Sequence, residues 1–225
     1  MLDKLYSILI KGGAAATILR GLSVTLKISV LALILGTILG IGICALRMSK
    51  FKPFSLLAKV YISVVMGSPL TMLLMLLYYC VFAKTNMDAV YVAVITFGLN
   101  TAAYVAEMFR SAINAVNKRE SEACLTLGFT KFQALRYVVF PQAMEIAKPV
   151  YKSTIINMIQ WTSVVGYVTI TDLTRVINNI SSRTMQPLLM IIIGMIMYIA
   201  ISYLVSGIFA LVDVVSSKNK NKGGN

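Results

Sequence analysis

Residues 122–128 read Glu-Ala-Cys-Leu-Thr-Leu-Gly, a polar, helix-forming segment that closes on a glycine. The segment lies between long apolar runs and is followed by Pro141-Gln142-Ala143 and by Pro149. Residues 114–146 are rich in Ala, Leu, Glu and basic residues, so we predict two short helices with the turn at Gly128. A membrane protein that interrupts its spans in this way is expected to receive force or a signal there from a soluble partner.

Five uncharged, largely apolar stretches around this segment predict membrane-spanning helices. The 225 residues are 58% hydrophobic and 13% charged, with a mean hydropathy of +0.82, whereas about a quarter of a soluble domain is charged. Roughly 20 apolar residues cross the hydrocarbon core as a helix that satisfies its own backbone hydrogen bonds. The predicted spans are 28–46, 60–83, 89–106, 153–171 and 185–212. The fold class is therefore an all-α membrane protein with five transmembrane helices.

The net charge of +13 follows the positive-inside rule, so it does not point to nucleic acid. Most Lys and Arg residues lie between spans one and two, between spans three and four, and after span five. This distribution predicts an outer N-terminus and a cytoplasmic C-terminus. We expect residues 1–21 to form an amphipathic interfacial helix, residues 22–213 the five-helix domain, and residues 214–225 a polar tail that is disordered over 218–225.

Polar residues inside spans two and three are candidates for a substrate path. Pro69 in Gly67-Ser68-Pro69 should kink or break its helix, and broken helices in membranes line cavities or are buried in protein. A plain packing kink is an equal alternative. Span three carries Asn100, Tyr104 and Glu107, and a carboxylate there should avoid lipid. A local ion pair between Glu107 and Arg110 is the alternative interpretation.

Span four carries a dense polar cluster, which should face a cavity or another helix. Its members are Asn157, Gln160, Trp161, Thr162 and Ser163. Structural hydrogen bonds between helices are an equal alternative. In span one, Gly36 and Gly40 permit close helix approach, which we interpret as packing inside the chain in preference to dimerisation.

No catalytic or metal site is predicted. The chain has no His, and no P-loop, dinucleotide motif or nucleophile elbow occurs in it. Cys44, Cys80 and Cys124 lack the spacing of a metal site and are interpreted as small packing residues.

Three blocks of this sequence resemble the permease subunit of ATP-binding-cassette importers for polar amino acids, the histidine/glutamine/arginine-type family. Gly21-Leu22-x-Val24-Thr25-Leu26 resembles that family's opening of span one, and Gly67-Ser68-Pro69-Leu70 resembles its R-G-T-P-L block. Glu107-x-x-Arg110, Glu122-Ala123-Cys124-x-x-Leu127-Gly128 and Pro141-Gln142-Ala143 resemble its E-x-x-R block and its EAA loop. The third match is the most specific, and the resemblance extends from about residue 20 to residue 213.

The resemblance implies a type I importer permease in a bacterial cytoplasmic membrane. Its partners would be a second permease subunit, two cytoplasmic ATPase subunits that bind ATP and Mg, and an external solute-binding protein; this chain itself would bind no cofactor. The EAA segment would supply the coupling helices, with contacts at Glu122, Ala123, Cys124, Leu127 and Gly128. The substrate path would involve Gly67, Ser68, Pro69, Asn100, Tyr104, Glu107, Gln160, Trp161, Thr162 and Ser163.

Three positions depart from the family pattern. Met66 stands where the family usually has Arg, Cys124 replaces the second Ala of EAA, and Gln160 lies where a Lys is usual, so a partner permease could supply the missing charge. Other classes remain open: a non-transporting membrane scaffold or sensor, an integral-membrane enzyme, and an efflux transporter. The sequence names neither the amino acid nor the composition of the permease pair.

Overall fold

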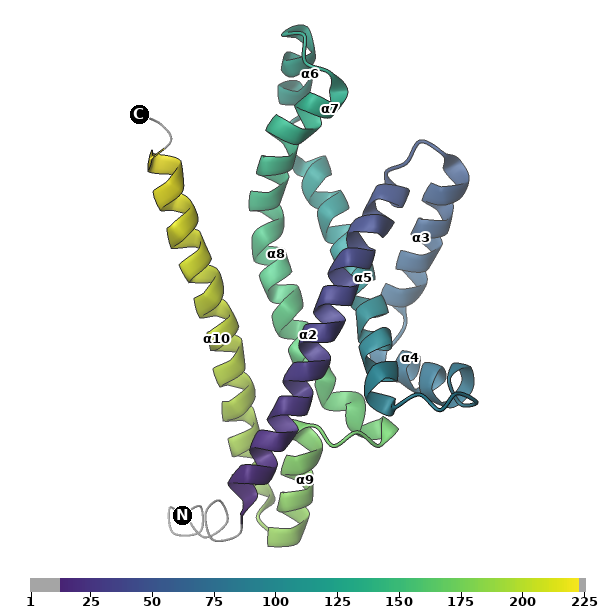
Figure 1. Cartoon of the computed structure of the whole chain (residues 1–225), viewed down its shortest axis with the longest axis vertical. Coiled ribbons are helices and arrows are strands. Elements are labelled where there is room, and N and C mark those ends of the chain that lie inside the picture. The colour runs from purple at the N-terminus through teal and green to yellow at the C-terminus, as the bar shows by residue number, and fades with distance from the viewer. Residues whose placement is uncertain (1–12, 223–225) are drawn as a thin grey trace. The chain divides into compact units, whose positions relative to one another are not determined.

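Helices make up nearly all of the described structure (Figure 1). The computed structural model describes residues 13–222, and no strand occurs among them. They divide into two compact units: one contains the described residues up to Ile28 together with those from Ile155 onward, and the other is Ser29–Thr154. The prediction of an all-α membrane protein is confirmed.

Three helices within residues 13–222 are long and apolar enough to cross a membrane: α2 (Ala14–Arg47), α5 (Ala89–Ala115) and the part Pro187–Asp213 of α10 (Pro187–Lys222). A fourth results if α3 (Lys52–Gly67) and Leu70–Val81 form one bent span. The predicted span 153–171 is not one α-helix, because α8 (Phe140–Trp161) ends inside it and a 3-10 helix, η4 (Thr162–Val168), follows. Residues 162–166 read Thr-Ser-Val-Val-Gly, which are weak α-helix formers. The count of five spans stays a prediction.

The predicted break at Gly67-Ser68-Pro69 is confirmed. Helix α3 ends at Gly67 and α4 (Leu70–Leu76) begins after Pro69 (Figure 1). The directions of α3 and of Leu70–Val81 differ by 107°. Proline lacks the backbone donor that a continuing helix would need. The Ser68 hydroxyl donates to the Val64 carbonyl at 2.7 Å, which satisfies this side chain at the bend. A π-helical stretch, η2 (Leu77–Val81), follows α4.

Within the unit Ser29–Thr154, two glycines bring α2 against α5. A Cβ atom added to Gly36 would lie 2.6 Å from Thr101 Cβ, and one added to Gly40 would lie 2.7 Å from Val105 Cβ. No side chain fits at these distances, so the backbones approach as closely as glycine allows. The interpretation of Gly36-x-x-x-Gly40 as internal packing is confirmed.

Residues 172–184 lie between the fourth and fifth predicted spans, and nearly all of them form an amphipathic helix, α9 (Leu173–Thr184). Its buried residues are Leu173, Val176, Ile177 and Ile180, which pack with Met190 of α10. Their spacing of i, i+3, i+4 and i+7 places them on one helical face. Asp172 caps α9 by accepting hydrogen bonds from the Thr174 and Arg175 amides, both at 3.0 Å. The polar composition of the segment hid this periodicity.

Both ends of the chain differ from the expectation. Residues 14–21 belong to α2 itself and do not form a separate interfacial helix; the rest of that prediction, residues 1–12, lies outside the described residues. Helix α10 continues to Lys222, so the tail predicted to be disordered from residue 218 is helical over 218–222. No Gly or Pro occurs there before Gly223, and lysines near a helix C-terminus interact favourably with its dipole.

Candidate functional site

The segment after α5 forms two short helices joined at Gly128, as predicted. Helix α6 (Lys118–Thr126) ends in a Schellman turn: the Phe129 amide donates to the Cys124 carbonyl at 3.0 Å, and the Gly128 amide to the Leu125 carbonyl at 3.1 Å. Gly128 has φ +89°, in the left-handed region that favours glycine. The turn therefore fixes how the chain leaves α6.

A reciprocal capping box starts the next helix, α7 (Lys131–Ala134). The Gln133 amide donates to the Thr130 hydroxyl at 3.2 Å, and the Thr130 amide donates to Gln133 Oε1 at 2.8 Å. A π-helical stretch, η3 (Leu135–Val139), then leads into α8. The turn and both short helices are thus specified by local hydrogen bonds.

Large apolar side chains surround this turn and face outward. Leu127 is 76% exposed, and three further side chains around it are exposed. We name this surface the apolar tip; its residues are Leu125, Leu127, Phe129 and Phe132. Glu122 is also exposed, whereas Cys124 is buried and packs as predicted. An exposed apolar patch with a polar neighbour is typical of a protein-binding surface.

The base of this segment is held to the helix ends behind it. The Gln142 side-chain amide donates to the Glu120 carboxylate and so joins α6 to α8. Ala143 is buried in a core cluster with Val105, Met108 and Val139. Pro141-Gln142-Ala143 therefore contributes one tether and one packing residue. The segment is thus joined to α8 by a hydrogen bond, and α8 packs against α5.

The predicted path residues of spans two and three all lie in the unit Ser29–Thr154. Tyr104, Glu107 and Met66 line a cavity of about 380 Å³. Arg110 donates to the Glu107 carboxylate through both Nε, at 2.9 Å, and Nη2. The local ion pair between Glu107 and Arg110, which was the alternative interpretation, is therefore present, and its carboxylate lies on the cavity wall.

The remaining path residues of this unit have mixed surroundings. Asn100 is only 3% exposed, and its Oδ1 has no hydrogen-bond partner in the described structure. Gly67 and Pro69 are exposed at the bend, and Ser68 is half-buried. Whether any of them contacts a substrate stays a prediction.

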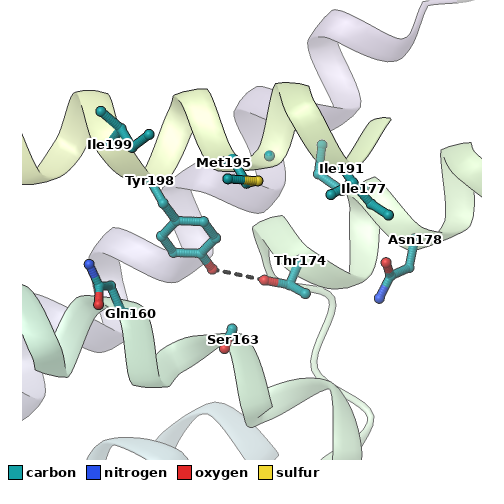
Figure 2. Close-up of a pocket in the computed structure, with 10 residues that line it drawn as sticks. Gln160, Ser163, Thr174, Ile177, Asn178, Ile191, Met195, Tyr198 and Ile199 are labelled. Atoms are coloured by element: carbon teal, nitrogen blue, oxygen red, sulfur yellow. Dashed lines mark hydrogen bonds between the residues drawn. The ribbon is translucent and has the colours of Figure 1, made fainter. Parts of the chain in front are cut away.

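The polar cluster of span four lies in the other unit and separates into two environments. Gln160 and Ser163 line a cavity of about 380 Å³ (Figure 2). Thr162 is fully buried, and its hydroxyl donates to the Ile159 carbonyl at 2.6 Å. Trp161 is half-buried. Gln160 and Ser163 are three residues apart and share one side of the helical turn, whereas Thr162 lies on another side.

Three further polar residues line the same cavity and were not predicted: Thr174 and Asn178 from α9, and Tyr198 from α10. In Figure 2, the Tyr198 hydroxyl points toward Thr174, and the two oxygens are 2.9 Å apart. Apolar side chains of α9 and α10 form the rest of the wall: Ile177, Ile191, Met195 and Ile199. The apolar periodicity of α9 was the sequence signal that could have identified Thr174 and Asn178.

Comparisons with known proteins agree on one family. A family model described as "Binding-protein-dependent transport system inner membrane component" matches residues 25–214. The probable amino-acid ABC transporter permease protein YckA of Bacillus subtilis is 34% identical over 185 residues, which cover 82% of this chain and 82% of the relative. The arginine transport system permease protein ArtQ of the same organism is 34% identical over 189 residues, which cover 82% and 85%.

Solved structures share the fold. The structure described as an amino acid ABC transporter with histidines matches with a TM-score of 0.83 and 33% identity, over 91% of this chain and 96% of that chain. An inward-facing MetNI methionine ABC transporter matches with a TM-score of 0.72 over 87% and 94%. Its identity of 17% supports the fold alone.

Proposed function

The chain belongs to the family of binding-protein-dependent transport system inner membrane components, and on this basis we propose that it is the permease subunit of an ATP-binding-cassette importer for polar amino acids. The relatives YckA and ArtQ, at 34% identity, carry amino-acid permease names, which supports this substrate class. The chain would move its substrate into the cytoplasm by alternating access.

The apolar tip carries the proposal for coupling. Leu127 and its exposed neighbours lie on two short helices whose geometry is fixed by the turn at Gly128, with Glu122 beside them. We assign this surface to a groove of a separate ATPase subunit, with contacts at Glu122, Ala123, Cys124, Leu127 and Gly128. Cys124 is buried, so it would contribute by packing beneath the apolar tip.

The remaining partners follow from the same assignment. Two ATPase subunits would bind ATP and Mg, a second permease subunit would complete the path, and an extracytoplasmic solute-binding protein would deliver substrate. Closure of the ATPase pair on ATP would move the two docked segments, and the tether between Gln142 and Glu120 would pass this motion to α8. Rigid helices would then open or close the path.

The proposed orientation places the apolar tip in the cytoplasm of a bacterial cell, with the N-terminus outside the cytoplasmic membrane. The basic residues beside the tip, including Arg119, Lys131 and Arg136, support this orientation under the positive-inside rule. ATP is available on the same side, which the coupling role requires.

Uptake by the reconstituted complex tests the proposal. The chain is purified with its ATPase and placed in vesicles with the solute-binding protein and radiolabelled glutamine, glutamate or arginine. We expect ATP-dependent uptake of at least one of them. Gly128→Asp should leave the chain in the membrane and allow ATP hydrolysis while uptake is lost, because a non-glycine residue at φ +89° alters the turn between α6 and α7.

A scaffold or sensor would give a different result. It would retain its partner but show no ATP-dependent uptake of any of the three amino acids. That outcome would contradict the permease assignment, and normal uptake by Gly128→Asp would contradict the role of the tip alone.

A further inference from the structure

A second cavity adjoins the one in Figure 2 and has a different chemical character. Its volume is about 440 Å³, and it shares Ser163, Thr174 and Asn178 with the first cavity. The second cavity is also lined by Gly166, Tyr167 and Arg175, which do not line the first. Both volumes lie within the range of about 300–1,000 Å³ that is usual for small-molecule sites. The three shared residues therefore form a polar border between the two cavities.

Arg175 gives the second cavity a positive charge. Among the described residues that line the two cavities, no other residue carries a formal charge. The Arg175 side chain is half-buried, and its Nη1 donates to the Gly166 carbonyl at 2.9 Å. This bond holds the guanidinium at the cavity wall and uses one of its five donor hydrogens. A planar group held in this way can bind a carboxylate through two parallel hydrogen bonds.

The carboxylate nearest to Arg175 along the chain, that of Asp172, does not line either cavity. Asp172 precedes Arg175 by three residues, but it is 0% exposed and its two oxygens accept the Thr174 and Arg175 amides. Asp172 is thus occupied as the cap of α9. The charge of Arg175 has no acidic neighbour on the described cavity wall.

The first cavity offers mainly apolar contacts beyond the polar border. Ile177, Ile191, Met195 and Ile199 line it, together with the Gln160 amide and the Tyr198 hydroxyl. An uncharged side chain with one amide or hydroxyl would be satisfied there. A cationic side chain would lose its hydration without gaining an anionic partner, which is costly in an apolar setting.

We propose that Arg175 binds the α-carboxylate of the transported amino acid, and that the adjoining cavity selects uncharged side chains over basic ones. This inference rests on the proposed function and deepens it by naming the substrate class. Ser163, Thr174 and Asn178 lie between the two cavities, where their side-chain oxygens can accept hydrogen bonds from the substrate's ammonium group.

Direct binding to the permease–ATPase complex, purified without the solute-binding protein, tests this assignment. Radiolabelled glutamine should bind, arginine should bind at least about tenfold more weakly, and the α-amide of glutamine should also compete at least about tenfold more weakly. A hydrogen-bonded pair with charged groups contributes about 1.5–3 kcal/mol, and 1.4 kcal/mol corresponds to tenfold. Arg175→Gln should reduce glutamine binding by a similar factor and abolish the preference for the carboxylate over the amide.

Two variants serve as controls. Arg183→Gln removes an exposed arginine at the other end of α9 and should bind glutamine like the wild type. Arg175→Lys keeps the charge and should retain part of the binding. Equal binding of glutamine and its α-amide by the wild type would overturn the carboxylate assignment without any variant. Equal binding of glutamine and arginine would overturn the side-chain selectivity.

Failure of this inference can be told apart from failure of the proposed function. ATP-dependent uptake with no carboxylate preference at the permease leaves the importer assignment intact and removes the role of Arg175. Absence of uptake for glutamine, glutamate and arginine removes the importer assignment itself.

Discussion

The hydroxyl oxygens of Thr174 and Tyr198 lie 2.9 Å apart and join α9 to α10 across the cavity of Figure 2. Hydrogen bonds between membrane helices contribute about 0.6 kcal/mol on average. We therefore expect Tyr198→Phe to lower the free energy of unfolding by about this amount, as measured by circular dichroism in detergent. Tyr203→Phe, at an exposed position of the same helix, should have no effect. Equal losses of unfolding free energy in Tyr198→Phe and Tyr203→Phe would show that the hydrogen bond between Thr174 and Tyr198 is not formed.

Alanine substitutions at two glycines of α2 should change the stability of the protein in opposite directions. A Cβ at Gly40 would lie 2.7 Å from Val105 Cβ, whereas a Cβ at Gly42 would meet nothing within 4 Å. Gly40→Ala should destabilise the protein by about 1–3 kcal/mol through overpacking. Gly42→Ala should stabilise it by up to about 1 kcal/mol, because alanine is the better helix former. Chemical unfolding in detergent measures both, and stabilisation of both would contradict the close approach of α2 and α5.

Leu127 is the most exposed residue of the apolar tip, at 76%. If it contacts the ATPase, Leu127→Glu should weaken the association of the two subunits at least about tenfold, since a central apolar contact contributes about 2 kcal/mol or more. Copurification and titration of the ATPase measure this change. Tyr137→Glu, at an exposed position outside the tip, is the matched control and should bind normally. Full binding by Leu127→Glu would exclude the tip as the docking surface.

Asp172 gives a pH-dependent prediction. Its complete burial raises the pKa of the carboxyl above the ordinary value, although the amide hydrogen bonds of Arg175 and Thr174 act in the opposite direction. The folded chain then binds the proton of Asp172 more tightly than the unfolded chain does. Protonation of Asp172 therefore adds to the free energy of unfolding at low pH, and this contribution is lost as the pH rises through the folded pKa.

Asp172→Asn keeps an acceptor at the cap of α9 and removes the titration. From about pH 4 upward, the wild type should therefore lose stability relative to this variant. Free energies of unfolding at several pH values measure the difference. Asp88→Asn changes the exposed cap of α5 and should keep the wild-type pH profile, because Asp172 is still present. A constant difference between wild type and Asp172→Asn would contradict the prediction.

Local sequence signals predicted much of the structure near the turns. Pro69 removes a backbone donor and Gly128 permits a positive φ, so the break after α3 and the turn after α6 could be located without tertiary information. The spacing of Gly36 and Gly40 predicted close helix packing, although only the structure identifies α5 as the partner. The tail predicted to be disordered from residue 218 is helical as far as Lys222, because no Gly or Pro interrupts residues 208–222.

The sequence by itself determined that the chain is an all-α membrane protein, where two of its helices break, and which segment resembles a coupling loop. Each follows from composition or from the backbone preferences of a few residues. Only the tertiary structure decided which polar residues share a cavity. One cavity is lined by Gln160 and Ser163 together with Thr174 and Tyr198. Helix α9 lies beside α10 because it buries Val176 and Ile177 there. Arg175 follows the cap of α9 by three residues. Such a juxtaposition depends on packing between distant segments, which no local pattern encodes.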